Sequence, residues 1–416
     1  MSPLRALVCA LAMAALWCIV VFHGALRGWW LEPVAPAGDE QAFAAAVAER
    51  VDAASPGSVA VGLIDDGELR TTHFRGVDRA VDERTRFPVA SLGKWLQAYG
   101  VLLLAQDGRI DLDAPVSRYL RRWQLPPPAP GLDNDEVTVR RLLSHTAGLT
   151  DGLGFADHDD DAPPPTLLET LAAPRASSGE AVRLRIETMP GAEWAYSGGS
   201  YLILELLVED VTGLSFESYM ARAVFAPIGM ARSSYAPLAA LTDTSGSWTA
   251  EGTPAPLFRY AAKGATGLVT TLGDLVRFVR AQQTGAPLEE RWVKTLREPQ
   301  GRVFGQPIWG PGAMLYAEDG LGDFVYGHDG ANDPSINATV RVDPSSGDGI
   351  VVLSTGPAFL ASELGYEWVL WRRGLPDFLQ TPRALRSALL PLLAGLALIV
   401  VACVAAMLGA GRRREG

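Results

Sequence analysis

The sequence predicts an α+β protein in which an antiparallel sheet, flanked by helices, is assembled from the two ends of a central domain, with a mostly helical lobe inserted between them. Three observations support this prediction: strand patterns near both ends of the domain, helical periodicity in its middle, and a long apolar segment outside each end.

At 416 residues the chain can bury a large core. Its 48% hydrophobic and 20% charged residues argue against disorder. The net charge of −11 argues against nucleic acid as a partner.

Two apolar segments bracket the chain. Residues 6–26 contain no Asp, Glu, Lys or Arg, and residues 387–411 carry no charge at all. Each segment is long enough to cross a bilayer, which takes about 20 residues in a helix. We therefore predict a transmembrane helix at each end. The first segment has a cleaved signal peptide as its alternative, with "PVAPAGD" at 33–39 as the best candidate for a cleavage site.

The charges beside the second apolar segment predict an orientation. The chain ends in "RRREG", and a basic cluster after an apolar span marks the cytoplasmic side. If both segments span, both termini are cytoplasmic and residues 40–380 lie on the extracytoplasmic, periplasmic side of the inner membrane. Cys9, Cys18 and Cys403 all lie in the apolar segments, so the domain between them has no disulfide and no thiolate metal site.

Strands are predicted at both ends of the domain at 40–380. An apolar strand at 59–64 meets the turn signal "DG" at 66–67, and a second strand follows, which is typical of a β-hairpin. Residues 336–356 show the same pattern, and 324–330 predict another strand just before them.

Helices are predicted in the middle of the domain. Residues 200–213, 215–225 and 271–285 have apolar residues at helical spacing. The Pro- and Asp-rich run at 156–165 is predicted to be a surface loop. His158 and its neighbouring aspartates suggest a metal site, but adjacent residues rarely converge on one ion, so we predict none.

The stretch "FPVASLGKWLQAYGVLLL" at 87–104 carries the first candidate chemistry. Ser91 and Lys94, one of three lysines in the chain, stand three residues apart at the start of an apolar helix and so share one of its faces. A serine hydroxyl becomes a nucleophile when a base takes its proton, and a desolvated lysine can be that base. The helix N-terminus favours the developing anion. The alternative is a helix-capping serine beside a lysine that reaches out to solvent.

Two later stretches extend the pattern. "PGAEWAYSGGSYLILELL" places Tyr196 in a loop just before a helix, and "VYGHDGANDPS" places His328 and Gly330 on or beside a strand. With the Ser-x-x-Lys pair, and in this order, they resemble the serine β-lactamase and penicillin-binding-protein superfamily. Within it they are most similar to the branch of class C β-lactamases, D-alanyl-D-alanine carboxypeptidases and family VIII esterases. The resemblance covers residues 42–372, including framework stretches at 140–149, 225–235 and 264–278.

The resemblance implies a role for each motif. Ser91 would attack a carbonyl and become acylated, while Lys94 and Tyr196 share the proton transfers. Which of the two takes the proton stays open, because a coupled pair titrates as a unit. His328 stands where many relatives have Lys; it would donate to Tyr196 or to a substrate carboxylate and is expected to titrate near neutral pH. The backbone N–H groups of Ser91 and Ala331 would form the oxyanion hole.

Two positions depart from the family pattern. Gly198 stands where the family usually has an Asn that contacts the substrate amide and the lysine; Ser197, Ser200 or a water are the candidate substitutes. This departure favours an ester or an unusual peptide over a lactam as substrate. Asp329 stands where relatives have a small or hydroxyl residue, and on a strand it should point to the face opposite its two neighbours. Gly198 and Gly330 are expected to line the substrate site.

The sequence therefore predicts a membrane-anchored, extracytoplasmic serine hydrolase of the peptidase or esterase type. It would act through an acyl-enzyme on a small-molecule, peptide or ester substrate, without metal or organic cofactor. The alternatives are a β-lactamase, a catalytically inactive binding module with the same fold, and a membrane protein whose domain serves a partner in the bilayer. Tyr196 and His328 have packed, hydrogen-bonded side chains as their alternative interpretation. His145 is predicted to be structural.

Overall fold

The computed structural model describes the chain except residues 1–2, 153–163, 177, 257–258, 333–335 and 413–416. Among the described residues the α-helices are α1 (Pro3–Leu26), α2 (Glu40–Ala54), α3 (Gly93–Gln106), α4 (Val139–Leu143), α5 (Leu167–Ala172), α6 (Gly198–Thr212), α7 (Phe216–Met220), α8 (Ala226–Ile228), α9 (Lys263–Thr266), α10 (Leu272–Thr284), α11 (Glu290–Thr295), α12 (Leu360–Arg373), α13 (Thr381–Ser387) and α14 (Leu389–Arg412). The strands are β1 (Val59–Asp65), β2 (Glu68–Arg75), β3 (Arg86–Pro88), β4 (Val269–Thr271), β5 (Gly301–Val303), β6 (Gln306–Trp309), β7 (Met314–Glu318), β8 (Phe324–Asn332), β9 (Ile336–Val342) and β10 (Gly349–Thr355). Short 3-10 turns are η1 (Ala90–Leu92), η2 (Val116–Arg118), η3 (Asn134–Glu136), η5 (Leu238–Ala240) and η6 (Phe378–Gln380), and η4 (Ala221–Phe225) is a π-turn.

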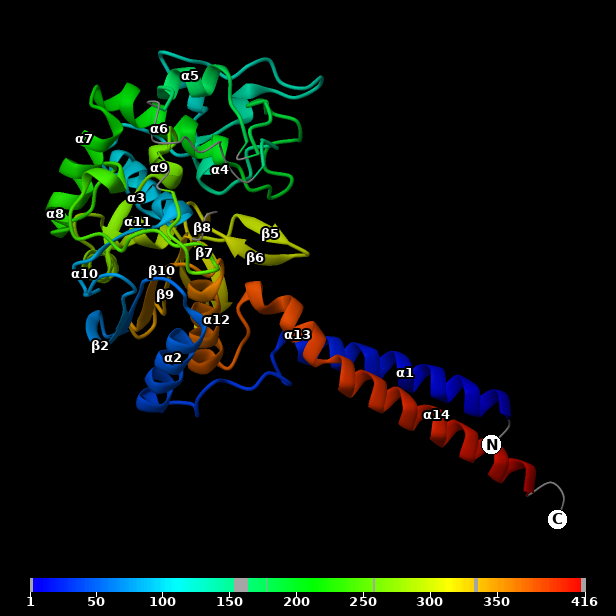
Figure 1. Cartoon of the computed structure of the whole chain (residues 1–416). Coiled ribbons are helices and arrows are strands. Elements are labelled where there is room, and N and C mark those ends of the chain that lie inside the picture. Colours follow the sequence, from blue (N-terminus) through cyan, green and yellow to red (C-terminus); the bar gives the residue numbers. More distant parts are fainter. Residues whose placement is uncertain (1–2, 153–163, 177, 257–258, 333–335, 413–416) are drawn as a thin grey trace. The chain divides into compact units, whose positions relative to one another are not determined.

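The chain divides into two compact units, drawn in Figure 1. The larger is residues 40–365, and the smaller combines residues 1–39 with residues 366–416. The larger unit contains an eight-stranded antiparallel sheet in the order β2-β1-β10-β9-β8-β7-β6-β5. Because β1 pairs with β10, the two ends of the domain meet in one sheet, which confirms the predicted architecture.

The two faces of the sheet carry different side chains. On β9 the apolar residues Ala338, Val340 and Val342 join the main core, which also contains α3 and α10. The alternate residues of β9 are polar and buried, and they lie under the first turns of α12. A strand places successive side chains on opposite faces, so one face of β9 builds the core and the other holds polar contacts. Both predicted hairpins, β1–β2 and β9–β10, are present.

The helical lobe runs from α4 to α9, between strands β3 and β4 (Figure 1, cyan to green). Its central helix α6 is capped at its start by Ser197, whose Oγ accepts a hydrogen bond from Ser200 N at 2.9 Å, and at its end by Gly213, which has a left-handed φ of 72°. The predicted helices at 200–213 and 271–285 correspond to α6 and α10. The acidic loop predicted at 156–165, with His158, lies largely outside the described residues, which contain no cluster of three or more His, Cys, Asp or Glu able to hold a metal.

The smaller unit pairs α1 with α14, and the start of α1 lies at the same end of the pair as the end of α14 (Figure 1). Ala6 packs against Cys403, and Trp17 lies against Gly395, where a side chain on the glycine would collide with the indole ring. Trp17 Nε1 donates to Pro391 O at 3.3 Å. Small residues allow such close approach between helices. Leu4–Leu26 and Phe378–Leu408 are each long and apolar enough to cross a membrane.

Candidate active site

Ser91 lies in η1, a single turn of 3-10 helix that joins β3 to α3. Ala90, directly before it, has a φ of 45°, a left-handed conformation that is rare for a residue with a side chain and costs about 1–3 kcal/mol. The turn is held by its surroundings. A Cβ built on Gly330 of β8 would collide with Val89 O and lie 2.9 Å from Leu92 N. The backbone of β8 therefore lies directly against the turn that carries Ser91.

Three predicted residues meet at this turn. Lys94 is 1% exposed, and its Nζ donates to Ser91 Oγ at 3.0 Å and to Ala265 O at 2.8 Å. Tyr196 OH donates to the same Ser91 Oγ at 2.9 Å from the loop before α6. Lys94 Nζ also lies 5.2 Å from the centre of the Tyr196 ring. The structure thus brings an amine and a phenol to the same serine hydroxyl, although Tyr196 is 105 residues away from Ser91 in the chain.

An aromatic cluster holds Tyr196 in place. The ring of His145 stacks on Tyr196 with centroids 4.4 Å apart, and Trp309 of β6 meets Tyr196 edge-on at 5.6 Å. His145 Nδ1 accepts from Ser197 N at 3.1 Å, and burial holds the pKa of His145 well below its usual range, so the ring is neutral. These contacts agree with the predicted structural role of His145. Trp309 lies in no sequence motif, so its contact with Tyr196 could not be predicted from the sequence.

A hydrogen-bond network caps the start of α6, where Gly198 lies. Ser197 Oγ donates to Asp151, and Asp151 Oδ2 accepts from Gly199 N at 2.9 Å. Ser200 Oγ donates to Ser197 Oγ at 3.0 Å. Both serine hydroxyls are therefore engaged in hydrogen bonds at the start of α6. Burial raises the pKa of Asp151, a residue that the sequence analysis did not single out.

His328 differs from its expected state. Burial lowers its pKa to about 3, so the expected titration near neutral pH is wrong. His328 Nδ1 lies 2.6 Å from Asp329 O. A carbonyl oxygen can only accept, so Nδ1 carries the proton and Nε2 of the neutral ring is a hydrogen-bond acceptor. Nε2 is buried and has no hydrogen-bond partner within the described part of the chain, so the expected donation to Tyr196 is not formed.

Asp329 points to the opposite face, as expected. Its carboxylate accepts from Tyr316 OH at 3.0 Å and forms an ion pair with the fully buried Arg341. Ala331 follows Gly330 on β8 and is exposed, next to the turn that carries Ser91. The two residues predicted to supply oxyanion-hole donors, Ser91 and Ala331, thus lie on adjacent segments.

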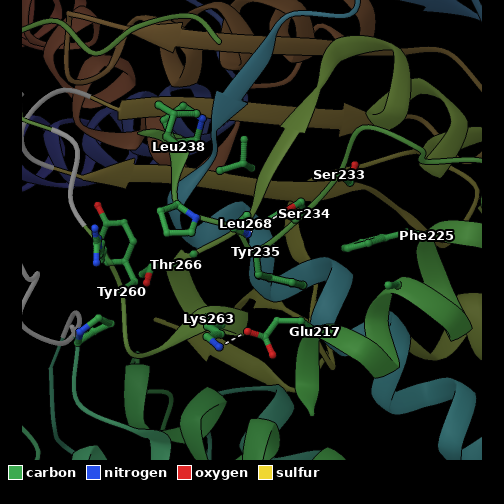
Figure 2. A pocket seen from close by; sticks show the side chains of 18 residues that line it. Glu217, Phe225, Ser233, Ser234, Tyr235, Leu238, Tyr260, Lys263, Thr266 and Leu268 are labelled. Atoms are coloured by element: carbon green, nitrogen blue, oxygen red, sulfur yellow. Dashed lines mark hydrogen bonds and ion pairs between the residues drawn. The ribbon is translucent and has the colours of Figure 1, made fainter. Parts of the chain in front are cut away.

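A cavity of about 540 Å³ lies beside α9 (Figure 2). Lys263 and Thr266 of α9 line it, and Lys263 forms an ion pair there with Glu217. Ser91, Lys94 and Tyr196 do not line it. Ala265 of the same helix holds Lys94 through its carbonyl, and Pro88 of β3, which also lines the cavity, precedes the turn that carries Ser91.

Comparison with known proteins defines the class. A family model described as beta-lactamase matches residues 43–369, and the chain belongs to this family. It is 28% identical over 171 residues to penicillin-binding protein 4* of Bacillus subtilis (strain 168), which covers 40% of this chain and 35% of that relative. The chain thus spans about a third of that relative's length.

Two solved structures share the fold. The octameric penicillin-binding protein homologue from Pyrococcus abyssi is 22% identical, with a TM-score of 0.66 covering 80% of this chain and 76% of that one. The D-amino acid amidase from Ochrobactrum anthropi SV3 is 20% identical, with a TM-score of 0.62 covering 83% and 98%. The resemblance to the serine β-lactamase superfamily and the predicted fold class are therefore confirmed.

We expect acid to weaken the fold through His328. In the unfolded chain a histidine takes up a proton near pH 6.5, but the folded side chain does so only near pH 3. Between these values the unfolded state binds more protons, so the free energy of unfolding falls as the pH drops. The free energy of unfolding of the full chain in detergent is measured by denaturant titration at pH 7 and at pH 5. Between these two pH values it should fall less for His328→Gln than for the parent. Equal losses would contradict the assignment of His328 as a buried neutral group.

Proposed function

We propose that the protein is a serine hydrolase that acts through an acyl-enzyme on an amide or ester, as a peptidase or esterase. The observation that supports this is the convergence of Lys94 Nζ and Tyr196 OH on Ser91 Oγ, at 3.0 and 2.9 Å. Distances of this length allow direct proton transfer between a nucleophile and its base. The hydrolase families among its structural neighbours agree with this chemistry.

The proposed reaction proceeds in two halves. Ser91 Oγ attacks the substrate carbonyl carbon, and its proton passes to the Lys94–Tyr196 pair. The N–H groups of Ser91 and Ala331 bind the oxyanion of the tetrahedral intermediate. The intermediate collapses, and the leaving alcohol or amine takes the proton from the same pair. A water then attacks the acyl-enzyme by the reverse route and gives its proton to Ser91 Oγ, releasing the carboxylic acid.

His328 supports a narrower choice of substrate. A lysine at this position would donate to a substrate carboxylate, but a neutral histidine whose Nε2 has only a lone pair cannot. The site therefore favours substrates that lack a carboxylate next to the scissile bond, such as simple esters and amides. Penicillins and peptides that end in a free carboxylate fit less well.

The substrate proposal is tested by exchanging this one side chain. We compare kcat/KM for a D-amino acid p-nitroanilide with that for the same compound carrying a carboxylate on the leaving ring, in the parent and in His328→Lys. A charge-assisted hydrogen bond contributes about 1.5–3 kcal/mol, so we expect His328→Lys to shift the ratio toward the carboxylate compound by roughly tenfold or more. The Ser91→Ala variant measures background. An unchanged ratio would overturn the role given to His328.

We further propose that α1 is retained and that α1 and α14 cross the inner membrane as a pair, with the catalytic unit on the periplasmic side. Support comes from the length and composition of the two helices and from the arginines that follow the second span. The packing of Ala6 and Ala10 on Cys403 is the contact expected of two paired spans.

This pairing predicts a cross-link. In a chain with Cys9 and Cys18 changed to alanine, Ala6→Cys should form a disulfide with Cys403 when membranes are oxidised, since Cys403 Sγ lies 3.7 Å from Ala6 O. Leu11→Cys is the matched control, because Leu11 is 63% exposed on α1. Non-reducing electrophoresis after cleavage between the helices reads the result. Equal cross-linking of both variants, or loss of residues 1–26 from the mature protein, would refute the paired anchor.

A further inference from the structure

Asn337 on β9 is fully buried, and the proposed mechanism does not use it. Its side chain makes three hydrogen bonds. Nδ2 donates to Gly330 O at 3.0 Å and to Ser362 Oγ at 3.1 Å, while Oδ1 accepts from Ser362 N at 3.0 Å. Asn337 therefore ties the first turn of α12 to the carbonyl of Gly330 on β8.

The carbonyl of Gly330 and the N–H of Ala331 belong to the same peptide group. Because a trans peptide is planar, its oxygen and its amide hydrogen point in opposite directions. A hydrogen bond that fixes the direction of Gly330 O thus also fixes the direction of the Ala331 N–H. The amide side chain of Asn337 accordingly sets the aim of the backbone donor expected to face the substrate.

This support matters because Gly330 has no side chain of its own to hold it. Glycine is required here, since any Cβ would collide with the turn around Ser91, yet glycine is also the most flexible residue of the backbone. Its neighbour Asp329 is anchored from the same face of the sheet, by Tyr316 OH at 3.0 Å and by Arg341. Asn337 restrains the next peptide along, where the flexible residue stands.

We propose that Asn337 is a positioning residue that aligns the Ala331 N–H of the oxyanion hole, held in place itself by the backbone N–H of Ser362 in α12. The inference rests on the proposed function, because an oxyanion hole has a role only if Ser91 is acylated. Losing one oxyanion donor typically costs about 10²–10³-fold in rate. A donor that is present but misaligned is weakened rather than lost. We therefore expect Asn337→Ala to cost roughly 10–100-fold in kcat.

The test compares an oxygen ester with the matching thionoester, in which sulfur replaces the carbonyl oxygen. The sulfur anion gains far less from an N–H donor, so the ratio of their kcat values reports the oxyanion hole itself. We expect Asn337→Ala to lower kcat for the oxygen ester, leave its KM within about threefold, and lower the ratio by about the same 10–100-fold. A purely structural role would slow both substrates equally, and that result would overturn the proposal.

Two further variants keep the test decisive if Asn337→Ala folds poorly. Asn337→Asp keeps the volume and the acceptor for Ser362 N, but as a carboxylate it cannot donate to Gly330 O; we expect the same collapse of the ratio, with partial recovery at low pH where the carboxyl is protonated. Ser362→Ala leaves the Gly330 bond in place and should retain the parental ratio. If Asn337→Asp keeps the parental ratio at neutral pH, the inference about Asn337 is wrong, while the proposed function still stands.

The failure of the proposed function would look different. In that case the parent itself would show no hydrolysis of the oxygen ester above the Ser91→Ala background. With Ser91-dependent turnover in the parent, only the Asn337 variants decide the present inference.

Discussion

Replacing Lys94 with methionine is expected to slow the acylation of Ser91 by about 10³-fold, since positioned proton transfer typically contributes 10²–10⁴-fold. Lys94 Nζ lies 3.0 Å from Ser91 Oγ, and its other acceptor is the neutral carbonyl of Ala265. Methionine has a similar length and fills the buried space of the Lys94 side chain, but it has no group that can exchange a proton. The measurement is the rate at which a fluorophosphonate modifies the full chain, followed by intact mass.

The control for this prediction is another lysine of the chain. Lys294 is a surface residue on α11 that forms an ion pair with Glu290. In the Lys294→Met variant the fluorophosphonate should modify Ser91 at the parental rate. Circular dichroism of both variants verifies that the fold is retained. Acylation of Lys94→Met within tenfold of the parent would show that Ser91 is activated by another group.

Gly330→Ala is the second change with a large expected effect. The added methyl group would overlap Val89 O and lie 2.9 Å from Leu92 N, and these are backbone atoms of the turn that carries Ser91. The strand and the turn must separate, which moves the Ala331 N–H away from the reacting carbonyl. Overpacking of this kind typically costs about 1–3 kcal/mol in the free energy of unfolding. The displaced donor should cost a further 10²–10³-fold in kcat.

A matched glycine separates steric conflict from general sensitivity. Gly273 lies in the first turn of α10, where an added Cβ would meet Glu83 O at 3.3 Å and Arg277 Nη1 at 3.5 Å. Gly273→Ala should therefore change kcat by less than about threefold, as surface changes away from a site usually do. The prediction for Gly330 is wrong if both variants keep parental kcat for an oxygen ester.

Local sequence patterns predicted the parts of the site that depend on short spacing. Ser91 and Lys94 are three residues apart, and Tyr196 precedes a helix with recognisable apolar periodicity. The two hairpins, β1–β2 and β9–β10, were predicted from apolar strand patterns on either side of a Gly-containing turn. Strands β5 to β7 are only three to five residues long, and no pattern of their own marked them.

The remaining features of the site arise from contacts between distant segments. Asp151 reaches Ser197 across 46 positions, and Asn337 acts through a carbonyl on the neighbouring strand. The charge state of His328 could not be predicted from the sequence, because burial and the carbonyl of Asp329 decide its protonation. Ser197 and Ser200 were candidate substitutes for the missing Asn, and their hydrogen bonds in the cap of α6 depend on the folded structure.

The central claim is that Ser91 is an activated nucleophile. The most direct test is the intact mass of the full chain in detergent after exposure to a fluorophosphonate and, separately, to a penicillin, with Ser91→Ala as control. We predict a single fluorophosphonate adduct on the parent, none on Ser91→Ala, and slower or no modification by the penicillin. A folded parent that gains no mass from either reagent, or an adduct that persists in Ser91→Ala, would contradict the account.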